Sequence, residues 1–476
     1  MGGLRRLLIF LLVVLKEPNM PEADCSCVPS SDCECPDRGF TNIPQDLPRS
    51  ISGLELRRNL ITTVNRPLLA RYINLTNLGL SGNQITKITA DTFTYLPKLK
   101  QLDLSKSNIT EIQPGAFQKL PLLESLTVHS NHITMIQTGT FANLSRCEFL
   151  YLSFNKITII SSGTFDNLPR LKRLHLCQNQ ITEIQTGAFA NYLPQLERLD
   201  LSSNKITIIS SGTFENLPKL QRLYLNKNQI KEIQTGAFAN LPQLEMLDLN
   251  SNKITIISSG TFENLPKLQR LCLFGNQITE IQTGAFANLL QLERLDLSYN
   301  KITIIRSATF ENLPKLQTLY LKNNQITENQ TGAIANLPQL EGLDLAYNQI
   351  TIISSGTFEN LPKLQGLYLN KNQIKEIQTG VFASLPQLEM LYLNSNKITI
   401  ISSGTFDNLP RLKRLNLFQN QITEIQTGAF ANLPQLERLD LSSNKITIIS
   451  SGTFENLPKL QWLNLAQNQI TEIQAG

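Results

Sequence analysis

The most constraining feature of this sequence is a repeat of about 24 residues that runs from residue 51 to the C-terminus. Its most regular part reads L-x-x-L-x-L-x-x-N-x-I, as in the segment from Leu220 to Ile230. The asparagine recurs every 24 residues, except for one step of 25 that contains an extra Tyr192, and Ser107 replaces it once. We count eighteen repeats, the last one incomplete. One repeat cannot bury its apolar face alone, so the chain must fold by stacking its repeats.

The pattern inside each repeat predicts its local structure. L-x-L places two leucines on one face of a short strand, while a later Ile and a Phe fill the opposite wall. The asparagine turns the chain, and its amide can bond backbone groups of its own and neighbouring repeats. Asn-Leu-Pro after each Phe prevents a long helix there. We predict an α/β solenoid with a concave parallel sheet of about 18 short strands and a convex side of loops and short 3₁₀ turns.

Near-identical copies of the repeat differ mainly at the outward positions of the strand, which face the concave side. Free drift of surface residues explains part of this variation, but it does not explain exposed aromatics gathered on one face. Tyr, Ser, Asn and Arg are typical of adaptable recognition surfaces. The predicted ligand-binding residues are Tyr151, Arg173, His175, Arg198, Asp200, Arg222, Tyr224, Asp248, Arg270, Phe274, Arg294, Asp296, Tyr320, Asp344, Tyr368, Tyr392, Arg414, Phe418, Arg438, Asp440 and Trp462.

The N-terminus is typical of a secreted protein. Arg5 and Arg6 precede an apolar stretch from Leu7 to Leu15, which is too short to span a bilayer and predicts a signal peptide over residues 1–20. No second apolar run of about 18 residues follows, so we expect no encoded membrane span.

Four clustered cysteines define a predicted N-terminal cysteine-rich cap over residues 21–50, before the repeats of 51–476. Cys25, Cys27, Cys33 and Cys35 are expected to form disulfides, in any of three pairings, because their spacing does not fit a zinc site. Sequons predict N-glycosylation at Asn74, Asn108, Asn143 and Asn329.

Three further cysteines and one atypical repeat lie among the repeats. Cys147 occupies a core leucine position, whereas Cys177 and Cys272 point outward, either as oxidisable thiols or as links between chains. Asn329 and Ile334 replace a core Ile and Phe within one repeat, which predicts a local weak point. A glycan on Asn329 would require the chain to bulge outward there.

Cys25-x-Cys27, then Cys35-x₄-Phe40-x₂-Ile43-Pro44 and 24-residue repeats, resembles extracellular leucine-rich-repeat proteins. The pattern is most similar to variable lymphocyte receptors of jawless vertebrates and more distantly to Toll-like receptor ectodomains. The resemblance implies recognition of a protein or glycan on the concave face, in innate or adaptive-like immunity. The alternative is a matrix or cell-adhesion protein. The resemblance also implies a cysteine-rich C-terminal cap, which is not found, so we expect a truncated product or an incomplete gene.

Other function classes have weaker signals. Arg173, His175 and Cys177 share one strand, with Asp200 beside them, but an open face without an oxyanion hole does not favour catalysis. We therefore expect a protein that is not an enzyme and holds no cofactor or metal. The net charge of +5 includes no Lys/Arg block, so we expect no nucleic-acid partner. The sequence leaves the oligomeric state open.

Overall fold

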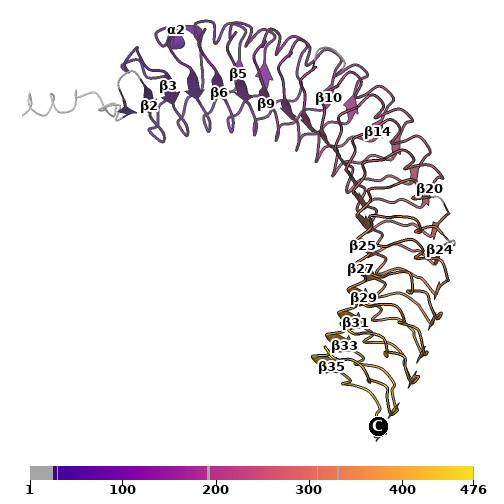
Figure 1. Cartoon of the computed structure of the whole chain (residues 1–476). Helices are drawn as coiled ribbons and strands as arrows, with labels where there is room; N and C mark the ends of the chain where they lie inside the picture. The colour runs from indigo at the N-terminus through magenta and orange to yellow at the C-terminus, as the bar shows by residue number, and fades with distance from the viewer. Residues whose placement is uncertain (1–24, 29–30, 190–192, 308, 330–331, 475–476) are drawn as a thin grey trace, which may run out of the picture. The chain divides into compact units, whose positions relative to one another are not determined.

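The computed structural model describes residues 25–28, 31–189, 193–307, 309–329 and 332–474 (Figure 1). The predicted signal peptide and Tyr192 lie outside these residues. The chain divides into two compact units, the first comprising residues 1–157 and 164–171, and the second comprising 158–163 and 172–476.

The first unit contains the N-terminal strands and five repeats. Its strands and one short helix are β1 (Ser26–Cys27), β2 (Asp32–Glu34), β3 (Gly53–Glu55), α2 (Arg66–Leu69), β4 (Asn77–Gly79), β5 (Lys87–Ile88), β6 (Gln101–Asp103), β7 (Glu111–Ile112), β8 (Ser125–Thr127) and β9 (Phe149–Tyr151). Strands β2, β3, β4, β6, β8 and β9 pair in parallel, each with the next.

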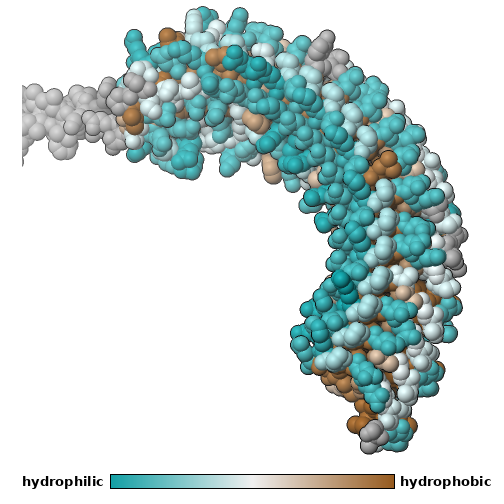
Figure 2. Space-filling view, in the orientation of Figure 1, coloured by the Kyte–Doolittle hydropathy of each residue, from teal (hydrophilic) through white to brown (hydrophobic). Residues whose placement is uncertain are grey.

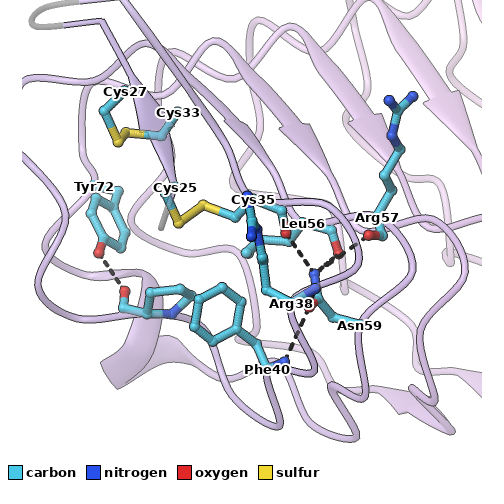
Figure 3. Close-up of a disulfide and its surroundings, with 11 residues drawn as sticks. Cys25, Cys27, Cys33, Cys35, Arg38, Phe40, Leu56, Arg57, Asn59 and Tyr72 are labelled. Carbon is cyan, nitrogen blue, oxygen red and sulfur yellow. Dashed lines mark hydrogen bonds between the residues drawn. A yellow bond between two sulfur atoms is a disulfide. The ribbon is translucent and has the colours of Figure 1, made fainter. Parts of the chain in front are cut away.

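Two nested disulfides close the N-terminal end of this unit (Figure 3). Cys25 pairs with Cys35 and Cys27 with Cys33, which selects one of the three pairings that the sequence left open. The second bridge joins β1 to β2, which pair antiparallel. The side chain of Asn59 donates to the carbonyl oxygens of Cys35 and Leu56, both at 2.9 Å. The cysteine-rich segment therefore supplies the backbone contacts that a preceding repeat supplies elsewhere.

The second unit repeats one three-residue strand thirteen times in its described part. The strands are β11 (Arg173–His175), β13 (Arg198–Asp200), β15 (Arg222–Tyr224), β17 (Met246–Asp248), β19 (Arg270–Cys272), β21 (Arg294–Asp296), β23 (Thr318–Tyr320), β25 (Gly342–Asp344), β27 (Gly366–Tyr368), β29 (Met390–Tyr392), β31 (Arg414–Asn416), β33 (Arg438–Asp440) and β35 (Trp462–Asn464). Each pairs with the next in parallel and in exact repeat register, so Leu199 lies beside Leu223 and Leu223 beside Leu247. Within this unit, Figure 1 shows β25 to β35 along the inner side of the curve.

Two-residue strands form the back of the second unit. They are β10 (Ile159–Ile160), β12 (Glu183–Ile184), β14 (Ile208–Ile209), β16 (Glu232–Ile233), β18 (Ile256–Ile257), β20 (Glu280–Ile281), β22 (Ile304–Ile305), β24 (Glu328–Asn329), β26 (Ile352–Ile353), β28 (Glu376–Ile377), β30 (Ile400–Ile401), β32 (Glu424–Ile425), β34 (Ile448–Ile449) and β36 (Glu472–Ile473). They pair in twos, as β14 with β16 and β18 with β20. Gln234 Oε1 reinforces the first of these pairs by accepting a hydrogen bond from the Ser211 backbone nitrogen at 3.1 Å. The sequence alternates between two repeat types, and these pairs join one of each.

The core consists of rows of identical residues. Strand leucines such as Leu223 and Leu225 are fully buried, as is Cys147 at its predicted leucine position. Phenylalanines stack at centroid spacings near 6 Å, as Phe214 does on Phe238 at 6.0 Å.

The back carries turns rather than 3₁₀ helices in the described residues, closed by single bonds such as Leu220 N to Leu217 O at 3.2 Å. The proline in each Asn-Leu-Pro lacks the N–H that a longer helix would need. The predicted solenoid of about 18 strands is therefore confirmed, and its convex side is almost free of helix.

Candidate ligand-binding face

We define the strand face as the outward side chains of β11 to β35 in the second unit. It has three rows. The first row is the first residue of each strand, the middle row is the third residue, and the last row is the residue two positions after that. The predicted residues from Arg173 to Trp462 belong to these rows, whereas Tyr151 lies on β9 of the first unit. On the side that Figure 2 shows, the surface is largely hydrophilic with scattered hydrophobic side chains.

Aspartates recur in the middle row and are held by their own strand ends. Asp200, Asp248, Asp296, Asp344 and Asp440 each accept a hydrogen bond from the backbone nitrogen two residues later, at 2.9 to 3.0 Å. Asp200 is only 8% exposed, so it presents less surface to a ligand than the sequence suggested. Burial raises the pKa of both Asp248 and Asp344 above the usual range of an aspartate.

Arginines recur in the first row. The guanidinium of Arg198 lies 4.5 Å from the centroid of the Tyr224 ring on the next strand, and its Nη2 is 3.8 Å from Asp200 Oδ2. The same Arg-Leu-Asp spacing recurs on β21 and β33, but among the described residues no ion pair joins Arg294 to Asp296 or Arg438 to Asp440. The first row thus presents exposed arginines beside a row of half-buried aspartates.

Aromatic side chains gather around β27 and β29. Tyr368 stacks on Tyr392 with ring centroids 5.2 Å apart and planes inclined by 15°. Tyr347, in the turn after β25, lies beneath Lys322 and Lys371, whose Nζ atoms are 5.2 and 5.7 Å from its ring centroid.

Two further aromatic groups lie on or beside the strand face. Phe274 packs against Tyr299 at 4.9 Å between ring centroids. Trp462 on β35 is 44% exposed. Exposed aromatic area of this kind is typical of recognition surfaces.

The cysteine and histidine positions do not favour nucleophilic chemistry. His175 and Asp200 are register neighbours on β11 and β13, but Asp200 Oδ1 already accepts from the Ser202 hydroxyl at 2.7 Å. Burial lowers the pKa of His175. Burial and the carboxylates of Asp248 and Asp296 raise the pKa of Cys272 to about 12, so its thiol is protonated at neutral pH.

The predicted glycosylation sites differ in access. Asn108 and Asn143 are exposed, although Asn108 directly follows the buried Ser107. Asn74 is partly exposed, and its side-chain oxygen accepts a hydrogen bond from Lys98 Nζ at 2.9 Å. The side chain of Asn329 lies outside the description, but its backbone pairs with Ile305 as in the sister repeats. Ile334 is fully buried in the place of the missing Phe.

Sequence reasoning did not anticipate a trough along the Asn-Leu-Pro turns. One stretch of it, from Leu193 to Asn288, has a volume of about 790 Å³ and is lined by Asn216, Pro218, Asn240 and Pro242 among others. Asn216, Asn240 and Asn264 adopt positive φ values of 60°, 68° and 59°, which set the turn ahead of the proline two residues later. The regular Asn-Leu-Pro spacing was the signal for this feature.

Comparisons with known proteins agree with this architecture. A family model described as "Leucine rich repeat" matches residues 73–133, 121–176, 169–230, 218–278, 273–326, 314–374, 362–422 and 411–470. A search of curated proteins finds no match. No helix in the described part of the chain is long and apolar enough to cross a membrane.

Several solved structures are similar to the chain. One is a TLR13–ssRNA13 complex, with 21% identity and a TM-score of 0.63 over 93% of this chain and 95% of the other. A leucine-rich-repeat protein of Leptospira interrogans has 27% identity and a TM-score of 0.61, over 87% and 96%. The glycosylated Toll–Spatzle complex of Drosophila has 21% identity and a TM-score of 0.70, over 94% of this chain and 63% of the other.

Proposed function

Because the chain belongs to the leucine-rich-repeat family, we propose that it is an extracellular recognition protein, receptor-like in role, that binds a protein partner on the strand face. One observation carries the proposal. The near-identical repeats keep their core and turns but vary at the outward strand residues, where tyrosines and arginines gather. The nested disulfides at the N-terminus support an extracellular location, since disulfides persist in oxidising compartments.

The charges of the strand face favour a protein over a nucleic acid. The solved relative in complex with single-stranded RNA makes RNA a competing ligand class. In this chain, aspartates recur in the middle row at Asp248, Asp296 and Asp344, while arginines recur in the first row, as at Arg270 and Arg294. A phosphate backbone crossing the strands would meet both signs of charge, whereas a folded protein can match them singly.

The test is a selection of binders to the full chain from a displayed library of extracellular protein domains. The strand-face variants are Tyr368→Ala with Tyr392→Ala, and Arg414→Ala with Arg438→Ala. The matched control is Ile208→Ser with Ile256→Ser on the back, where both isoleucines are 48% exposed. We expect at least one strand-face variant to weaken binding tenfold or more and the back variant to leave it unchanged. Binders lost only on the back variant overturn the proposal.

An adhesion or matrix role is the alternative. An immune repertoire varies between individuals at the outward strand residues, whereas an adhesion protein is uniform there. Sequencing transcripts of this locus from several individuals separates the two. Variation at positions such as 222, 246 and 366 over a fixed frame supports immune recognition, and uniform transcripts support adhesion.

A further inference from the structure

One position on the strand face is open where sister repeats carry an arginine. Strands β13, β21 and β33 read Arg-Leu-Asp, but β25 reads Gly342-Leu343-Asp344. A β-carbon built on Gly342 would meet one atom within 4 Å, the Thr318 Cγ2 at 3.7 Å, which is ordinary van der Waals contact. Gly366 on the next strand differs, because its β-carbon would lie 3.2 Å from the Tyr368 ring. The space above Gly342 is therefore the open one of the two.

The chain itself demonstrates what occupies the equivalent place on β13. Arg198 lies against two partners there, the carboxylate of Asp200 on its own strand and the ring of Tyr224 on the next strand. Both partners have counterparts around Gly342. Asp344 is on the same strand, and Tyr368 is its register neighbour on β27, as Tyr224 is of Asp200. Only the arginine differs, because Gly342 takes the place of Arg198.

The Asp344 carboxylate therefore has no arginine beside it on its own strand. It is half-buried, and its Oδ1 accepts from the Ala346 backbone nitrogen at 2.9 Å. Lys322, which lies over the Tyr347 ring, lowers the Asp344 pKa, but by less than burial raises it. Tyr320, on β23, is the other register neighbour of Asp344, so tyrosines lie on both sides.

We infer that Gly342, Asp344 and Tyr368 accept a cationic side chain, an arginine first, from the protein partner. The inference rests on the proposed function and names its anchor. The partner's guanidinium forms an ion pair with the Asp344 carboxylate and lies against the Tyr368 ring, as Arg198 does with Asp200 and Tyr224. Such a charge-assisted contact beside an aromatic ring is the kind of anchor that dominates protein interfaces.

Two substitutions isolate this position without disturbing the frame. Gly342→Arg fills it with the residue that Arg198, Arg294 and Arg438 supply elsewhere. Asp344→Asn removes the charge and keeps the turn, because Asn416 Oδ1 accepts the same backbone bond, from Phe418 N, at 3.3 Å. The matched control is Asp407→Asn, which removes the same charge in a turn of the second unit outside the strand face.

The experiment selects displayed random twelve-residue peptides on the full chain, with counter-selection against Gly342→Arg. We expect the surviving peptides to be enriched in Arg or Lys. Replacing that arginine by neutral citrulline in a synthetic peptide, or Asp344 by Asn in the protein, should weaken binding tenfold or more. Asp407→Asn should change it less than twofold. Circular dichroism melts of each variant check that the fold is intact.

Three results decide against the inference. Surviving peptides without Arg or Lys, or with equal affinity for the Asp344→Asn protein, overturn it. If those peptides nevertheless fail to bind the Tyr368→Ala with Tyr392→Ala variant, the proposed function stands and only the inference of an arginine-binding position is rejected. If the selected peptides bind every strand-face variant as tightly as the wild type, both the proposed function and the inference of an arginine-binding position are rejected.

Discussion

The amide nitrogen of the Asn228 side chain lies 3.0 Å from the carbonyl oxygen of Leu201, a residue of the preceding repeat. The same nitrogen donates to Leu225 O at 3.0 Å, and Asn228 Oδ1 accepts from Ile206 N at 3.0 Å. One buried side chain thus satisfies three backbone groups in two repeats. Similar bonds recur along the chain, for example at Asn83 and Asn372.

Removing this bridge should destabilise the protein strongly. Asn228→Ala leaves two buried carbonyls without this donor and one buried N–H without an acceptor, and we expect a loss of about 3 kcal/mol. Urea unfolding followed by circular dichroism measures it. The partly exposed Asn226, two residues earlier, provides a control, since Asn226→Ala should cost less than about 0.5 kcal/mol. Equal losses for both variants would contradict the bridging role.

Ser107 marks the one described repeat in which this bridge is missing. Its hydroxyl is buried and has no hydrogen-bond partner. Ser107→Asn should restore the bonds made by Asn83 and Asn131 on either side and stabilise the protein by about 1 kcal/mol. The shift in urea midpoint checks this, and a lower midpoint would mean that the site has no room for the amide.

The phenylalanine stack can be probed with a replacement that the chain already uses. Phe238 is fully buried between Phe214 and Phe262, at centroid distances of 6.0 and 6.2 Å. Phe238→Ala should cost about 3–5 kcal/mol because it leaves a cavity. Phe238→Ile should cost about 1.5 kcal/mol, because Ile334 fills the equivalent place and is also fully buried. Thermal unfolding of both variants compares the two costs.

The ionised Asp344 carboxylate should lower the stability of the folded protein at neutral pH. Burial raises its pKa in the folded state, so the folded protein binds its proton more tightly than the unfolded chain does. Stability is therefore lost as pH rises through the ordinary value of 3.8, and the loss is complete above the folded pKa. Asp344→Asn should be more stable than the wild type at neutral pH, with no advantage at pH 3. Unfolding curves at both pH values test this, and an advantage that is larger at pH 3 contradicts it.

The Cys272 thiol should react slowly with alkylating reagents despite its place on the strand face. With a pKa of about 12, roughly one molecule in ten thousand carries the thiolate at pH 8. Alkylation by iodoacetamide, followed by mass spectrometry of the Cys272 peptide, should be on the order of a hundredfold slower than for an ordinary cysteine. Asp248→Asn should speed the reaction because that carboxylate helps to raise the pKa. A rate unaffected by Asp248→Asn would mean that the Asp248 carboxylate does not contribute to the raised pKa.

The sequence by itself determined the period, the inward leucines, the asparagine bridge and the row of phenylalanines. These follow from the backbone, because alternation along a strand and a fixed repeat length decide which side chains point inward. It also placed the outward rows on one face, although the ligand roles of those residues are proposals.

Only the tertiary structure decided which neighbours each residue has. It selected Cys25 with Cys35 and Cys27 with Cys33 from three pairings. It placed Asp200 nearly out of reach of solvent and left the space above Gly342 open. The physical reason is that exposure and pairing depend on the size and direction of side chains one strand away, which lie about 24 residues apart in the sequence and become neighbours only in the folded register.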